Sequence, residues 1–122
     1  MKKDVSDRQN QFANAMDVQD LERVRDLMHD LSIQGLKALL AGRPHEQAGE
    51  LDQITVDDFV RQQNARERTS KMVNMWVQVM LGVDATEISA WSFIDYCARG
   101  GGLMQMRSDS KHGGQYLRFR KG

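Results

Sequence analysis

Apolar residues recur at steps of three and four positions from Asp17 to about Ala41, with charged and amide side chains between them. This spacing places the apolar side chains on one face of a helix. We therefore predict a long amphipathic helix over this stretch, and the pattern leaves open whether Gly35 interrupts it. The apolar positions are Val18, Leu21, Val24, Leu27, Met28, Leu31, Leu36, Leu39 and Leu40.

Residues 42–50 are polar and contain two glycines and the only proline of the chain. Glycine and proline favour turns and interrupt periodic structure. We predict a loop or linker here, which divides the chain into a helical lead-in, residues 1–50, and a second part, residues 51–122.

The second part begins with signals for short helices. Thr55 and Asp58 have the spacing of a capping box, in which each side chain accepts from the backbone of the other, so a helix should begin there. An apolar stripe from Arg66 to Met80 predicts the next helix, which Gly82 should close in the left-handed conformation. The same capping pattern over residues 84–87 predicts a further helix from Ile88 to about Ala98.

After the three glycines at 100–102, the apolar period changes from about 3.6 to 2. The alternation predicts one strand over residues 103–107 and a second over residues 115–120, joined by a polar loop. A lone hairpin is only marginally stable. We therefore predict an α+β, mostly helical fold that ends in a β-hairpin belonging to a larger sheet.

Charge and hydropathy limit the partners. Seventeen basic residues balance seventeen acidic ones, so net charge does not favour nucleic acid or a membrane surface. The tail from Arg99 onward is basic and includes Tyr116 and Phe119, as in single-strand binders, but a charge-paired strand face accounts better for it. No window approaches the roughly 20 apolar residues of a membrane span. We expect no nucleic-acid partner, no membrane segment, and a soluble intracellular protein, cytoplasmic or peroxisomal.

Few residues suggest chemistry by themselves. The three histidines lie far apart and lack partners at metal-ligand spacing, which predicts no metal site. Cys97 falls on an apolar helix, where an inert buried thiol is the expected state. The glycines follow a predicted helix and precede a predicted strand, whereas a phosphate-binding loop has the opposite order.

The order of features in the second part resembles a known family. These features are a capped helix from Glu87, the glycine run, the Met-rich stretch to Met106, and Gly113-Gly-Gln115 opening a basic segment. Together they resemble the middle of the flavin-containing monoamine oxidases, and most closely the fungal amine oxidases. The resemblance covers residues 51–122, and residues 1–50 match only as a polar helical lead-in.

The resemblance implies an activity for a parent enzyme. In that family FAD accepts a hydride from an amine, the resulting imine hydrolyses to an aldehyde and ammonia, and oxygen reoxidises the flavin to give hydrogen peroxide. The family's substrate domain is a mixed sheet packed on helices, and residues 51–122 look like part of it. The family's dinucleotide motif, flavin-attachment cysteine, water-holding lysine and aromatic pair have no counterparts here. We therefore expect a fragment of such an enzyme that binds no flavin alone.

The resemblance also implies roles for single residues. Gln115 matches a glutamine that lines the substrate cavity beside the flavin, and Val79 and Met80 match an adjacent pair on the cavity wall. Met106, or Arg107 in the neighbouring register, falls near the gate between the entrance and the inner cavity. Trp76, with Met72, falls where the helix borders the entrance. The alternative from a different class is a non-catalytic helical interaction module that docks through its C-terminal strand.

Overall fold

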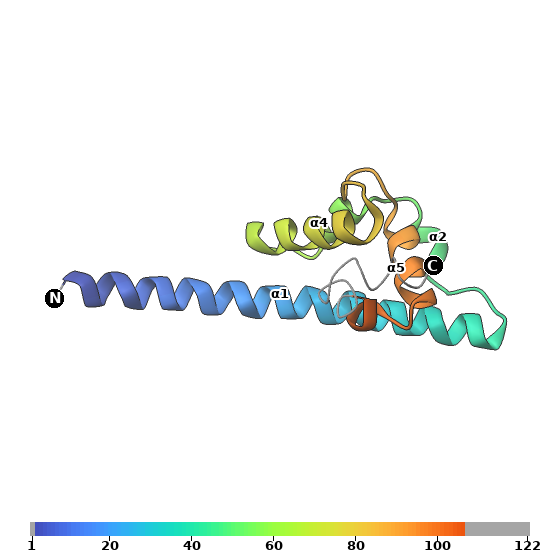
Figure 1. Ribbon diagram of the computed structural model, residues 1–122, viewed down its shortest axis with the longest axis horizontal. Coiled ribbons are helices and arrows are strands. Elements are labelled where there is room, and N and C mark those ends of the chain that lie inside the picture. Colours follow the sequence, from blue (N-terminus) through green and yellow to red (C-terminus); the bar gives the residue numbers. More distant parts are fainter. Residues whose placement is uncertain (1, 107–122) are drawn as a thin grey trace, which may run out of the picture.

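One long helix organises the structure. The computed structural model describes residues 2–106, with side chains described from Gln11 onward. Helix α1 lies along the full length of the molecule, and the other helices pack along one side of it and leave its N-terminal end uncovered (Figure 1). The helices are α1 (Lys2–Ala41), α2 (Ala48–Leu51), α3 (Val56–Gln62), α4 (Glu67–Leu81) and α5 (Ala90–Arg99). Residues 103–106 form a further helical turn.

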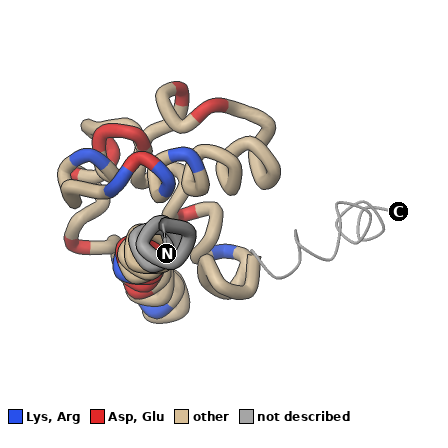
Figure 2. The backbone as a smooth tube through the Cα atoms, turned by 90° about the vertical axis from the view of Figure 1, so that its left-hand side faces the viewer, with Lys and Arg blue, Asp and Glu red and all other residues tan. Residues whose placement is uncertain are grey.

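The core lies between α1 and the helices beside it. Seen roughly along α1, the shorter helices all lie to one side of it (Figure 2). Val24, Met28 and Leu31 of α1 are buried in one cluster with Phe93 and Ile94 of α5. Burying an apolar side chain of this size contributes about 1.5–3 kcal/mol. The middle of the apolar face predicted for the first helix is therefore buried in the core, whereas Val18, Leu39 and Leu40 of that face are exposed.

Several local predictions are confirmed. Thr55 and Asp58 form the capping box of α3, with N–H to oxygen distances of 3.0 and 3.2 Å. Gly82 ends α4 with φ of +71°, in the left-handed region that residues with a β-carbon rarely adopt. Both signals involve residues within four positions of each other, so the sequence contains the whole interaction.

The predicted β-hairpin is wrong where the structure describes it. Residues 2–106 contain no strand, and their only β-type pairing is an isolated antiparallel bridge between Thr55 and Ser89. Residues 103–106, the predicted first strand, are helical. Leu103 and Met106 are both buried. Residues three positions apart lie on the same face of a helix, whereas in a strand they would point to opposite faces. The predicted second strand lies outside the described residues.

Three boundaries also differ from the prediction. Helix α1 begins well before Asp17 and continues through Gly35, where a β-carbon would lie 3.1 Å from the Ala98 side chain. The glycine thus permits close approach of α5 rather than ending α1. Helix α5 begins at Ala90 instead of Ile88, because Ser89 accepts from the backbone N–H of Ser92 at 3.0 Å. The predicted loop contains the short helix α2.

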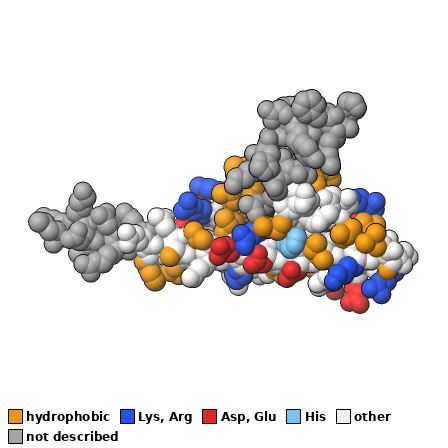
Figure 3. Space-filling view, turned by 60° about the horizontal axis from the view of Figure 1, so that its bottom comes forward, with side chains coloured by type: hydrophobic (Ala, Val, Ile, Leu, Met, Phe, Trp, Pro, Cys, Tyr) orange, Lys and Arg blue, Asp and Glu red, His pale blue; other side chains and the backbone are white. Residues whose placement is uncertain are grey.

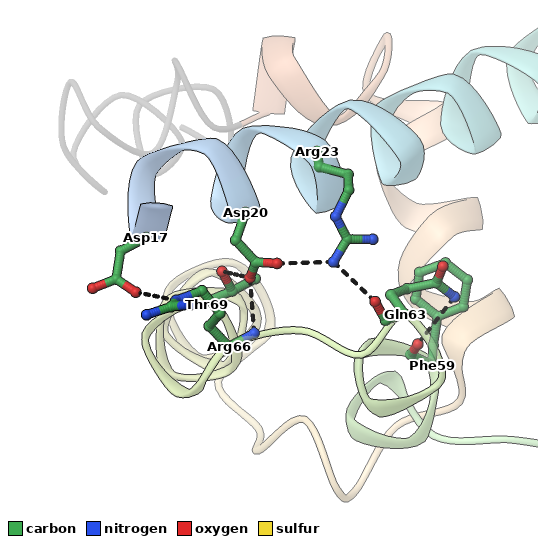
Figure 4. A network of polar contacts seen from close by, with 7 residues as sticks. All are labelled: Asp17, Asp20, Arg23, Phe59, Gln63, Arg66 and Thr69. Carbon is green, nitrogen blue, oxygen red and sulfur yellow. Dashed lines mark hydrogen bonds and ion pairs between the residues drawn. The ribbon is translucent and has the colours of Figure 1, made fainter. Parts of the chain in front are cut away.

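Asp20 of α1 binds the start of α4 (Figure 4). Arg66, the residue before α4, provides no side-chain cap. Instead the Asp20 carboxylate accepts from the backbone N–H of Arg66 at 2.8 Å and from the Thr69 hydroxyl at 2.5 Å. An oxygen at this position satisfies a donor that a helix start leaves unpaired. A side chain from one helix therefore caps another.

Arginines extend this contact to both sides. Arg23 donates to Asp20 at 2.8 Å and to the backbone oxygen of Gln63 at 2.9 Å. Asp17 accepts from Arg66 at 2.6 Å. Burial by itself would raise the pKa of Asp20, but hydrogen bonds from Thr69 and Arg23 and from the Arg66 backbone together lower it.

We expect Asp20→Ala to lower the free energy of unfolding by about 1–2 kcal/mol, because the cap of α4 is lost. Chemical denaturation followed by circular dichroism measures this change. Glu22→Ala, an exposed position on the same helix, is the matched control and should change stability by less than about 0.5 kcal/mol. Equal effects of the two substitutions would show that the contact contributes nothing.

The Asp20 contact should also depend on acidity. Because the folded state lowers the pKa of Asp20, its stabilisation is complete above the unfolded carboxyl value of about 4 and is lost as pH falls through the folded value. In Asp20→Asn the loss of stability between about pH 5 and 3 should be smaller than in the native chain. Denaturation midpoints across that range test this expectation.

Candidate functional site around α4 and the glycine turn

Helix α4 presents two different apolar faces. Val73, Trp76, Val77 and Met80 are buried, whereas Met75 and Val79 are 48% and 58% exposed. Adjacent residues on a helix point about 100° apart. Val79 and Met80, the adjacent residues predicted to line one cavity, therefore point to different sides of α4. Met80 points into the core, and Val79 points outward.

Met106 lies in the helical turn that follows the glycines. It is buried, and its thioether lies where a side chain on Gly100 would begin. Gly101 and Gly102 have φ of +98° and +113°, so the backbone between α5 and this turn requires residues without a β-carbon. The glycine run is thus a tight helix-to-helix connection.

Three of the predicted site residues are part of the hydrophobic core. Trp76, Met80 and Met106 belong to one buried cluster, and Met72 packs against it partly buried. The Tyr96 hydroxyl donates to the backbone oxygen of Met80 at 3.4 Å, which ties α5 to the end of α4. Val79 is apart from the cluster on the surface. Gln115 and Arg107 lie outside the described residues, so their cavity roles stay predictions.

The glycine run does not have the free donors of a phosphate site. Contrary to the sequence argument, a helical turn and not a strand follows the glycines. A helix start after the glycines is one of the features that a phosphate loop needs. However, the first two N–H groups of that turn, on Leu103 and Met104, already bond to Ser32 and His29 of α1. These two N–H groups are therefore not available to a phosphate.

Cys97 lacks the features of a nucleophile. It is fully buried in α5, and burial raises the pKa of its thiol to about 12. A thiol attacks as its thiolate, and this one stays protonated at neutral pH. Within residues 11–106, no three side chains of His, Cys, Asp or Glu gather as a metal site would require.

Three surface hollows lie elsewhere on the molecule. One of about 440 Å³ borders Lys37, Arg43 and Glu46, and a smaller one of about 160 Å³ beside it borders Trp91 and Arg99. A third, of about 510 Å³, lies over the charged start of α4. None of the three is bordered by a residue that the resemblance places in the substrate cavity.

Sequence reasoning did not find the polar residues that α1 contributes. In the sequence His29 is one of three scattered histidines, and no local pattern distinguishes Asp20 or Ser32. Asp20 bonds to a residue 46 positions away, and Ser32 to one 71 positions away. The one local signal is that neither α4 nor the turn at 103 has a good capping residue of its own.

Comparisons with protein-family models, with curated proteins and with solved structures found no match to this chain. Across the part that the structure describes, no helix combines the length and the apolar character needed to cross a membrane.

The two faces of α4 should respond differently to truncation. Met80→Ala should lower the free energy of unfolding by about 2–4 kcal/mol, because it leaves a cavity in the core. Val79→Ala, its neighbour on the exposed face, should change stability by less than about 0.5 kcal/mol. Urea denaturation of both variants measures the difference. A large loss in Val79→Ala would mean that Val79 is covered in solution.

Proposed function

We propose that this chain is a segment of the substrate-binding half of an FAD-dependent amine oxidase. The observation that carries the proposal is the order of features along one stretch of the sequence. Gly82 follows α4, Gly100 follows α5, a Met-rich turn comes next, and Gly113-Gly-Gln115 comes after it in the sequence. This order, within residues 51–122, resembles that of the fungal amine oxidases.

The exposed face of α4 supports this proposal. A segment that forms one wall of a larger cavity needs apolar side chains that point away from its own core. Met75 and Val79, one helical turn apart, have this orientation. Exposed apolar groups are also found singly on many proteins. Their place on the helix that the resemblance assigns to the cavity gives these two their weight.

In the proposed enzyme the chemistry belongs to FAD, bound by other parts of the parent protein. The flavin accepts the hydride from the amine-bearing carbon, and water and oxygen complete the conversion to aldehyde, ammonia and hydrogen peroxide. The residues of this chain orient the amine. A mostly apolar wall with one neutral amide, that of Gln115, can hold an uncharged amine without trapping a charge.

The alternative from sequence is an interaction module that docks through its C-terminal strand. That strand lies outside the described residues, so this alternative stays a prediction. Residues 103–106, which the sequence assigns to the preceding strand, are helical.

The proposal is tested on the natural protein that contains this segment. Purified from its source, that protein should carry the yellow absorbance of flavin and release hydrogen peroxide when an amine is added. The chain of residues 1–122 alone is the control and should bind FAD no more tightly than about 10 μM, near −6.8 kcal/mol. A natural protein without flavin, or a tight complex of FAD with residues 1–122, would contradict the proposal.

In such an enzyme Gln115→Ala should lower kcat/KM for the amine by roughly threefold to twelvefold, the loss expected for one hydrogen bond of about 0.5–1.5 kcal/mol. The flavin content should be unchanged. Steady-state kinetics and flavin absorbance measure the two quantities. Loss of flavin together with activity would instead assign Gln115 a structural role.

A further inference from the structure

The helical turn at residues 103–106 is held at its start by two side chains of α1. The Ser32 hydroxyl oxygen accepts from the backbone N–H of Leu103 at 2.9 Å, and His29 Nδ1 accepts from that of Met104 at 3.2 Å. The residue before the turn is glycine and has no side chain to serve as a cap. Ser32 and His29 are three positions apart on α1 and thus lie on one face.

The serine contact does not respond to pH. Ser32 and Leu103 are both fully buried, and the serine hydroxyl also donates to the backbone oxygen of His29 at 2.6 Å. Both of its hydrogen bonds involve neutral groups that do not titrate near neutral pH. It therefore fixes the first residue of the turn under all mild conditions.

The histidine contact depends on the charge of the ring. For Nδ1 to accept from Met104, the imidazole must be neutral with its hydrogen on Nε2. A proton on Nδ1 would place a donor against a donor. The ring lies close to the backbone of the turn, because a β-carbon added to Gly102 would be 3.1 Å from its Cε1.

The charged groups around His29 are few. In the packed segment, residues 100–106, every residue is glycine, leucine, methionine or glutamine, so that segment presents no titratable side chain to the ring. On α1 the charged residues within one turn are Arg25, Asp26 and Asp30, and the first two bond to each other at 2.9 Å.

We propose that His29 is a proton-sensitive positioning residue for the turn that carries Met106. Neutral His29 and Ser32 both accept hydrogen bonds from the start of the turn. A charged His29 no longer accepts from the Met104 N–H, so the turn is held less firmly at its second residue. The placement of Met106 near the gate of a substrate cavity rests on the proposed function. The hydrogen bond between His29 and Met104 does not depend on that function.

Nuclear magnetic resonance on residues 1–122, without flavin, tests the proposal. Between about pH 8 and 5, where histidine changes charge, the Met104 amide protection factor should fall by roughly twofold to twelvefold, as expected for loss of one hydrogen bond. The fall should follow the ring nitrogen shifts of His29. The Leu103 amide should change less. Unchanged Met104 protection across that range would overturn the proposal.

Two substitutions distinguish charge from packing. His29→Asn keeps an acceptor near the place of Nδ1 that does not titrate, so Met104 protection should be retained at pH 8 and lose its pH dependence. His45→Asn is the matched control, because His45 Nδ1 accepts from the Gln47 N–H within its own loop at 2.9 Å. Here the pH dependence at Met104 should persist. If Met104 protection still depends on pH in His29→Asn and no longer does so in His45→Asn, the role of His29 is refuted.

These measurements are independent of the oxidase proposal. If the natural protein carries no flavin, the proposed function fails, and the pH dependence of Met104 protection still tests the role of His29. If Met104 does not respond to pH, the positioning role fails while flavin content and peroxide release are unaffected.

Discussion

Helix α1 provides hydrogen-bond acceptors that other helices lack. A helix start leaves backbone N–H groups without intrahelical partners. Helices α3 and α5 satisfy one of theirs through their own Thr55 and Ser89. Helix α4 and the turn at 103 depend on Asp20, His29 and Ser32 instead. The apolar face of α1 holds these elements in contact, and its polar residues determine where they begin.

This arrangement explains why α1 can be both long and mixed in character. Its core-facing side carries buried apolar residues, and its capping residues Asp20, His29 and Ser32 bond to elements that lie far away in the sequence. On the exposed face, apolar side chains are interspersed with acidic and basic ones (Figure 3). The N-terminal part of α1 extends beyond the other helices (Figure 1), and Phe12 is 68% exposed. The contacts of α1 with the start of α4 begin at Asn14 and Asp17.

Sequence reasoning succeeded where the interaction was local. The Thr55 capping box, the left-handed Gly82 and the apolar stripes could all be predicted, because each involves residues a few positions apart. It failed over residues 103–106, where four residues are too few to distinguish a period of 2 from one of 3.6. The contacts of α1 with α4 and with the turn could not be predicted, because they require knowing which helices meet.

The candidate site was predictable to a similar extent. Periodicity identifies α4 as a helix with a buried face, and Met80 and Trp76 lie on that face. The outward position of Val79 follows from which side of α4 meets α1, and this is a tertiary property. The role of Gln115 depends on resemblance alone.

The capping residues of α1 set the distance along its axis between two other elements. Asp20 and His29 are nine positions apart, a rise of about 14 Å along a helix. This length fixes the separation between the start of α4 and the turn at 103. One residue inserted between them would rotate one contact by about 100° relative to the other, so both could not form. Insertions and deletions between Asp20 and His29 should therefore be poorly tolerated.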